Sequence, residues 1–119
     1  MKKIIVATDF SPSAMNAVNY AVDMASSIQA DLILLHVYQV PVSYAEIPVA
    51  VNLDDIQRNV EDELNKIREE INSKKTARSN IETEVRVGTF FPELKTVCEI
   101  VKPYTVILGS QGKTAAERF

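Results

Sequence analysis

The sequence contains one cysteine, one histidine and no long apolar segment. Because Cys98 stands alone, no disulfide can form within the chain, and with only His36 beside it there is no Cys/His set for a metal ion. The apolar stretch at positions 4–7 is too short for the hydrophobic region of a signal peptide. No apolar run approaches the roughly 18 residues of a membrane span. These absences favour a domain without disulfides, a metal centre or a membrane anchor.

Basic residues are not in excess either. Thirteen Lys and Arg stand against sixteen Asp and Glu, which gives a net charge of -3. This balance lacks the positive field expected of a nucleic-acid-binding protein. A length of 119 residues with 46% hydrophobic content suits one compact domain with a single core. We therefore expect a single cytoplasmic domain over residues 1–119 that binds neither nucleic acid nor membranes.

Apolar strands alternate with segments of helical period, an arrangement typical of a parallel sheet with crossover helices. The helices are expected from Pro12 to about residue 30, over residues 56–71, and from Pro92 until Pro103 stops the last one. The strands are expected at residues 4–8, 31–37, 81–87 and 106–108. The pattern thus predicts an α/β fold with four strands and three helices.

Two segments differ from this regular pattern. Residues 81–87 alternate apolar with charged side chains, which is typical of a half-exposed strand at the edge of a sheet. The segment from Tyr38 to Leu53 has no helical period and is long for a loop in a small domain. We interpret it as a candidate lid or partner surface, although its apolar residues could also simply pack.

The run from Thr105 to Thr114 joins a buried apolar strand to a Gly-x-x-Gly loop. Gly109 and Gly112 would let backbone N–H groups approach an anion without obstruction by side chains. The tripeptide at 112–114 imitates the end of a Walker A motif, but that motif needs a glycine where this chain has Ile107. The P-loop interpretation therefore fails on spacing, and the glycines are also compatible with an ordinary turn.

Asp9 is the other candidate for a binding role. Ligands of open parallel sheets bind outside the carboxyl ends of the strands, where the strand order reverses. If the first and last strands are neighbours, Asp9 faces the loop that begins at Gly109. A carboxylate there suits a ribose hydroxyl and would repel a phosphate. Asp9 could equally help to cap the helix that follows it, where a negative side chain is favoured.

Other reactive residue types have structural interpretations. His36 lies inside a predicted strand without a catalytic partner, so we interpret it as a packed or hydrogen-bonded core residue. Cys98 lies on the inner face of the third predicted helix, as a small buried hydrophobe. Ser11 is most simply a helix cap. No paired carboxylates, activated nucleophile or metal triad can be assembled from these residues, so no enzymatic activity is indicated.

Four short segments occur in the order typical of one family. They are Lys-Ile-Ile-Val-Ala-Thr-Asp-Phe-Ser at 3–11, Leu-Leu-His-Val at 34–37, Val-Gly at 87–88 and Val-Ile-Leu-Gly-Ser-Gln-Gly at 106–112. Together they resemble the universal stress protein family over the whole chain. The resemblance implies a three-layer, Rossmann-like open parallel sheet with flanking helices and strand order 3-2-1-4-5.

The resemblance also implies which residues meet a ligand. In ATP-binding members of the family, Ala7 and Val37 stand where backbone groups touch the adenine, and Asp9 stands where the nucleoside is held. Leu108 and Gly109 line the same cleft, and the second glycine offers its backbone amide to a phosphate. The predicted ligand-binding residues are Ala7, Asp9, Val37, Leu108, Gly109 and Gly112.

The family loop Gly-x2-Gly-x9-Gly-Ser/Thr is present here only in its first two glycines. Its third glycine would fall beyond Phe119, and so would the fifth strand of the family. We therefore expect a C-terminally incomplete domain, as in the first part of a longer tandem protein. Without a fifth strand, the fourth becomes an unprotected apolar edge, through which a homo-oligomer such as a dimer could form.

The resemblance makes a regulatory module of the stress response the leading functional hypothesis. Such a module would bind an adenine nucleotide, ATP, with or without Mg2+, and any hydrolysis would be slow and incidental. The alternative is a nucleotide-free interaction or dimerisation module of the same family. A nucleotide-activating enzyme of related fold would need a Ser-Gly-Gly loop after the first strand, and residues 9–13 do not supply one.

Overall fold

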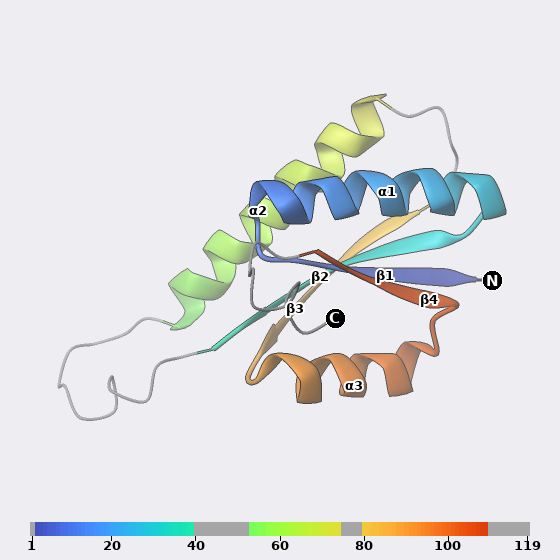
Figure 1. Ribbon diagram of the computed structural model, residues 1–119. Coiled ribbons are helices and arrows are strands. Elements are labelled where there is room, and N and C mark those ends of the chain that lie inside the picture. The colour runs from blue at the N-terminus through green and yellow to red at the C-terminus, as the bar shows by residue number, and fades with distance from the viewer. Residues whose placement is uncertain (1, 40–52, 75–79, 110–119) are drawn as a thin grey trace, which may run out of the picture.

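A computed structural model describes residues 2–39, 53–74 and 80–109 of the chain. Within them, strands and helices alternate in the expected order (Figure 1). The strands are β1 (Lys3–Thr8), β2 (Asp31–Tyr38), β3 (Ile81–Val87) and β4 (Thr105–Gly109). The helices are α1 (Pro12–Ile28), α2 (Leu53–Lys74) and α3 (Phe90–Val101). Each element predicted from the sequence is confirmed.

The strands form one parallel sheet in the order β3-β2-β1-β4. Helices α1 and α2 lie against one face of the sheet and α3 lies against the other, which makes three layers (Figure 1). The α/β fold and the strand order 3-2-1-4 are therefore confirmed. β3 is an edge strand, as its alternating sequence predicted, and within the described residues β4 forms the opposite edge.

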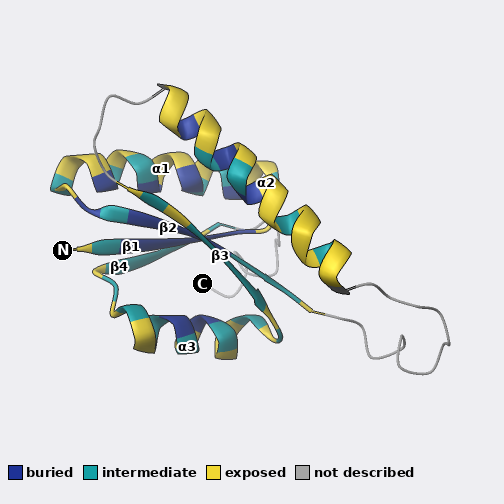
Figure 2. Cartoon of the chain, turned by 180° about the vertical axis from the view of Figure 1, so that it is seen from behind, coloured by how far each residue is buried: buried dark blue, intermediate teal, exposed yellow. Residues whose placement is uncertain are grey.

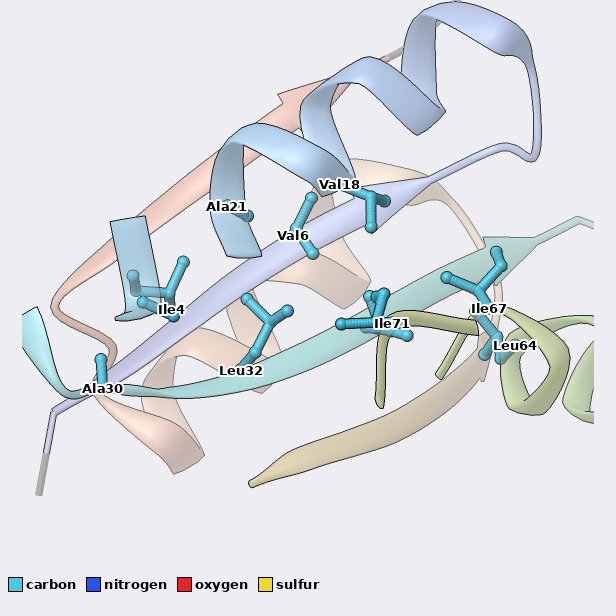
Figure 3. Close-up of a cluster of buried hydrophobic side chains, with 11 residues drawn as sticks. Ile4, Val6, Val18, Ala21, Ala30, Leu32, Leu64, Ile67 and Ile71 are labelled. Carbon is cyan, nitrogen blue, oxygen red and sulfur yellow. The ribbon is translucent and has the colours of Figure 1, made fainter. Parts of the chain in front are cut away.

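The core consists of two apolar clusters, one on each face of the sheet. The central strands β1 and β2 are buried on both faces, which explains their nearly continuous apolar sequences. On one face, their side chains pack between small residues of α1 and the branched residues Leu64, Ile67 and Ile71 of α2 (Figure 3). Figure 2 shows the same two helices with buried inner faces and exposed outer faces.

Helix α1 begins where the sequence predicted. Ser11 is its N-cap and accepts a hydrogen bond through Oγ from Ala14 N (3.2 Å), and Pro12 takes the first helical position. The helix ends at Gln29, which adopts the left-handed conformation. Its buried face is made of three alanines and a valine: Ala14, Val18, Ala21 and Ala25. Such small side chains allow the helix to lie close to the sheet.

Several element boundaries differ from the sequence prediction. Helix α3 begins at Phe90 with Thr89 as N-cap, so Pro92 lies within the first turn and not at its start. Proline is tolerated there because first-turn N–H groups have no acceptor within the helix. Strand β2 continues to Tyr38 because it pairs with β3 that far, and α2 begins already at Leu53. Residues 40–52 of the predicted loop, and residues 110–119, lie outside the described residues.

Candidate functional site

The carboxyl ends of β2, β1 and β4 lie side by side at one edge of the sheet, because the strands are parallel and β1 lies between the other two. Helix α1 leads from β1 to β2 on one face, whereas α3 leads back from β3 to β4 on the other face (Figure 1). The strand order therefore reverses between β1 and β4, which is where ligands bind in open parallel sheets. The neighbourhood of the first and last strands, on which the predicted site depended, is confirmed.

Three predicted site residues share one face of this edge. Ala7 and Leu108 are direct partners in the β1–β4 register, and Ala7 pairs on its other side with Leu35 of β2. Val37 follows Leu35 on the same face, because side chains alternate along a strand, and this face packs against α3. Ala7 is buried, Val37 is half-buried and Leu108 is 46% exposed. We call these three residues, Ala7, Val37 and Leu108, the apolar shelf.

The backbone of β2 extends past its ladder with β1. The β1–β2 pairs run from Lys3–Asp31 to Ala7–Leu35, whereas β2 pairs with β3 as far as Tyr38. Residues 36–38 thus project beyond the β1 ladder at the carboxyl edge, beside the apolar shelf. The Tyr38 carbonyl accepts from Gly88 N on the β3 side. Because backbone groups alternate in direction along a strand, those of Val37 point to the β1 side, past the last β1–β2 pair. This placement fits the backbone contact predicted for Val37.

The chain leaves β1 through a hydrogen-bonded turn. Thr8 is buried, and its Oγ1 accepts a hydrogen bond from Phe10 N (3.0 Å). Asp9 Oδ1 accepts one from Ser11 N (2.9 Å), and Ser11 caps α1 through Ala14 N. Each of these polar side chains binds a backbone N–H group slightly further along the chain, which is the chemistry of Asx and ST turns. The turn is therefore fixed by local side chains before any ligand is considered.

Asp9 is exposed and lies at the open edge of the sheet. It is not the N-cap of α1, since that position belongs to Ser11. Asp9 therefore does not cap the helix itself, but it shapes the turn that precedes the cap. A carboxylate has two oxygens and about four acceptor positions, so the bond from Ser11 N sets its direction and leaves it able to accept from a ligand. That Asp9 holds a nucleoside stays a prediction.

Gly109 ends β4 in contact with the first turns of α1. A Cβ atom at this position would collide with Cβ of Ala17 and would lie 3.0 Å from Cα of Ala14 and 3.3 Å from the carbonyl oxygen of Ser13. Close packing of strand and helix therefore requires glycine here, whichever ligand binds. The contact also brings the end of β4 to the N-terminal end of α1, which carries a positive partial charge. Gly112, the second predicted glycine, lies outside the described residues.

Two further residues at this edge were not among the predicted site residues. His36 Nδ1 lies 2.7 Å from the carbonyl oxygen of Thr8, and the imidazole centroid lies 4.7 Å from that of Phe10. Phe10 has a φ of 66°, in the left-handed region that bulky residues rarely adopt. The hydrogen bond expected of His36 is confirmed, but the ring is half-buried and not part of the core. Its partner was not predictable from local pattern, because only the β1–β2 pairing brings the two together.

The remaining reactive residues are not gathered into a metal site. Within residues 2–39, 53–74 and 80–109, no group of three or more His, Cys, Asp or Glu side chains could hold a metal ion. Cys98 is a free, half-buried thiol that packs against the α3-side core, as the sequence predicted. Helices that could cross a membrane are also absent from the described part of the chain.

Comparison with known families identifies the chain. The model of the universal stress protein family matches residues 1–119. This chain belongs to the universal stress protein family. The resemblance drawn from four short segments is thereby confirmed. A comparison with curated proteins finds no match.

Solved structures of universal stress proteins have the same fold. UspA from Lactobacillus plantarum is 19% identical, with a TM-score of 0.70 over 93% of this chain and 80% of that chain. A universal stress protein in complex with cAMP is 20% identical, with a TM-score of 0.66 over 88% and 69%. A family member from Arabidopsis thaliana with AMP bound is 20% identical, with a TM-score of 0.57 over 94% and 78%. At these identities the likeness establishes the fold alone.

Proposed function

We propose that this universal stress protein is a cytoplasmic regulatory module that binds an adenine nucleotide, with ATP as the expected ligand. The observation that carries the proposal is the apolar shelf beside the Asp9 turn. It lies at the reversal of strand order and is open to solvent at Leu108, which is 46% exposed. Small-molecule sites combine an apolar surface with a few oriented polar groups. The parts of this edge suit the base, the sugar and the phosphates in turn.

The apolar shelf suits the adenine ring. A flat base that covers Leu108 and Val37 removes apolar surface from water on both partners, which is the main source of affinity for such a ligand. The edge of the base needs hydrogen-bond partners at the same time. The backbone groups of Val37, beyond the last β1–β2 pair, would supply them. Backbone recognition of this kind agrees with the roles predicted for Ala7 and Val37.

Asp9 suits the ribose and gives the nucleotide a direction. An ionised carboxylate only accepts hydrogen bonds, and a ribose hydroxyl donates one. The same charge repels phosphates, which would extend away from Asp9 toward Gly109. The first turn of α1 itself contains no acidic residue, and the Asp9 carboxylate, bonded to Ser11 N just before the helix, offsets only part of the positive partial charge of the helix end. Gly112 would add its backbone amide, as the family resemblance implies.

Relatives support a ligand of this class. One is described in complex with cAMP and another with AMP bound, and both ligands are adenine nucleotides. ATP is our extension from these, because the glycine loop predicted at 109–112 would serve additional phosphates. Mg2+ would enter with the phosphates, as it usually does at nucleotide sites. The proposal is one of binding without catalysis, with the role in stress adaptation taken from the family.

Isothermal titration of the chain with ATP, with and without Mg2+, tests the proposal directly. AMP and cAMP are titrated beside it, and GTP serves as the matched control because it carries the same phosphates on a different base. ATP should bind at least about tenfold more tightly than GTP, the equivalent of one hydrogen bond in the base pocket. At about 100 times its Kd, ATP should stabilise the fold by about 2.7 kcal/mol. Absence of heat with every adenine nucleotide would contradict the proposal.

A second candidate is an interaction module that associates with itself through β4. The observation in its favour is the exposed side chain of Leu108 on a strand that, among the described residues, pairs only with β1. An apolar edge strand of this kind readily pairs with another chain. This candidate predicts a concentration-dependent dimer whose formation does not need nucleotide.

A further inference from the structure

His36 contacts the turn that carries Asp9 although it belongs to a different strand. Its Nδ1 lies 2.7 Å from the carbonyl oxygen of Thr8, and its ring packs on that of Phe10 at 4.7 Å between centroids. Thr8 and Phe10 are the two chain neighbours of Asp9. The imidazole therefore touches the residue before Asp9 and the residue after it, without belonging to the apolar shelf.

The hydrogen bond fixes which ring nitrogen carries a proton. A carbonyl oxygen can only accept, so His36 Nδ1 must be the donor. Whenever the imidazole is neutral, it must therefore be the Nδ1–H tautomer, with Nε2 unprotonated. The distance of 2.7 Å lies at the short end of the range for N–H···O bonds. Both the donor and the ring face of His36 are thus engaged by the turn.

The two peptide planes on either side of Asp9 are held by separate hydrogen bonds. The Thr8 carbonyl belongs to the planar peptide that ends at the Asp9 Cα, and His36 holds that carbonyl. The Phe10 N–H belongs to the next peptide, and Thr8 Oγ1 accepts its hydrogen bond at 3.0 Å. Since both flanking planes are fixed, the backbone angles of Asp9 are fixed, and with them the direction in which its side chain leaves the chain.

The same contacts hold Phe10 in an uncommon conformation. Its φ of 66° is one that a bulky residue keeps only when its surroundings enforce it. The imidazole packed against the Phe10 ring, with the two planes tilted by 32°, and the bond from Phe10 N to Thr8 Oγ1 supply that enforcement. Without the donor on His36, the Thr8 carbonyl loses the bond that holds its peptide plane, and the direction of the Asp9 side chain is less restricted, although the bonds from Phe10 N and Ser11 N remain.

We infer that His36 is a positioning residue for nucleotide binding: its Nδ1–H donor and its ring orient the turn that presents Asp9 to the ribose. The inference rests on the proposed function, because it explains how Asp9 is oriented for its proposed contact with the ribose. It also differs from a role in the core. A residue that only fills space can be replaced by another ring of similar shape, whereas a positioning donor cannot.

Three variants separate these roles in titrations with ATP. His36→Phe keeps a ring on Phe10 and removes the donor, and its Kd should rise about tenfold, as for the loss of one hydrogen bond. His36→Asn restores an N–H donor near the Nδ1 position, and its Kd should return to within about threefold of wild type. Val85→Ala is the matched control, because Val85 is the β3 partner of His36 in the sheet register and touches the same core. It should lose stability yet keep its Kd.

A measurement on the unmodified protein completes the test. Nitrogen-15 NMR of the imidazole should find Nδ1 protonated and Nε2 unprotonated in the neutral ring, whether or not nucleotide is present. If Nδ1 is unprotonated, or if wild type binds ATP and His36→Phe binds it equally well, the role of His36 is refuted while the proposed function stands. If wild type itself does not bind any adenine nucleotide, the proposed function fails and the positioning role fails with it.

Discussion

Asp9 combines two tasks that chemistry can separate. Its Oδ1 accepts the hydrogen bond from Ser11 N that shapes the turn, a task for which the amide oxygen of asparagine is equally suited. Its negative charge is needed only for a ligand that donates hydrogen bonds. The hydrogen bond therefore serves folding, whereas in the proposed function the charge serves the ligand, and one pair of substitutions distinguishes the two.

Asp9→Asn and Asp9→Ala should affect folding and binding in different proportions. Asparagine preserves the acceptor for Ser11 N, so the melting temperature should hardly change, whereas alanine removes that acceptor and should lower it by a few degrees. Both substitutions should weaken ATP binding, and alanine should raise the Kd by about tenfold or more, because a ribose hydroxyl loses a charged acceptor. Titration calorimetry and thermal melts measure the two effects. An Asp9→Ala protein that binds ATP like wild type would require the ribose to lie elsewhere.

The sequence predicted the position of these residues better than their contacts. Asp9 and Gly109 follow strands whose apolar runs are plain, so their place at the carboxyl edge could be deduced. The contact of Gly109 with Ala17 and the bond from His36 to Thr8 join residues far apart in the chain. Such contacts depend on strand register and on the distance between helix and sheet. No local spacing encodes either quantity.

At the scale of elements, the approach of α1 to β4 determines the geometry of the predicted phosphate end. Gly109 fits against Ala14 and Ala17 because none of the three presents more than a methyl group. The helix can therefore begin beside the end of the strand instead of standing away from it. Its capping by Ser11, with Pro12 next, was predictable because caps are local. The closeness of the packing was not, since a glycine in a Gly-x-x-Gly loop has several possible causes.

Gly109→Ala should destabilise the fold through this contact. The added Cβ meets Cβ of Ala17, and such overpacking costs about 1–3 kcal/mol of unfolding free energy. Ala17→Gly alone should cost about 1 kcal/mol through helix propensity. In the double variant the collision with Ala17 is relieved. Its loss of unfolding free energy should therefore be smaller than the sum of the two single losses by about 0.5 kcal/mol or more. Urea denaturation of wild type, the two single variants and the double variant measures these free energies. Strictly additive losses would mean that residues 17 and 109 are not in steric contact.

Helix α3 illustrates how an element boundary is missed. Proline is common at the first helical position, so the sequence predicts that the helix begins at Pro92. The structure begins the helix at Phe90 after Thr89, with Pro92 still in the first turn, where the missing N–H group costs nothing. Proline is tolerated equally at the first helical position and later in the first turn, because neither N–H group has an acceptor within the helix. The apolar contacts of Phe90 with the core decide between them, and those contacts are tertiary.

At the scale of the whole molecule, the two faces of the sheet are covered differently. Helices α1 and α2 lie on one face, while among the described residues α3 alone lies on the other (Figure 1). Leu108 belongs to the face of α3 and lies at the outer edge, with 46% of its surface exposed. The same side chain therefore serves both functional candidates, as a base platform or as a contact between two molecules.

Sedimentation velocity over a range of concentrations separates these two uses. If β4 pairs with a second copy, wild type should shift toward a dimer as concentration rises, and Leu108→Lys should stay monomeric because a charge is placed in the interface. Ile100→Lys is the matched control, since Ile100 is also exposed but lies on α3, and it should behave like wild type. A wild-type protein that is monomeric at every concentration would rule out association through β4.

The pairing of β1 with β4 also has a consequence for how the protein is made. β1 leaves the ribosome before β4, with β2 and β3 between them in the chain, so the apolar shelf joins segments synthesised at different times. The first three strands can pair while synthesis continues, but Ala7 acquires Leu108 as its neighbour only after α3 and β4 have followed. Closing so long a loop is entropically costly and slow. A ligand bound on the shelf, as proposed above, would recognise only molecules in which β4 has docked, and by mass action it would favour that docking.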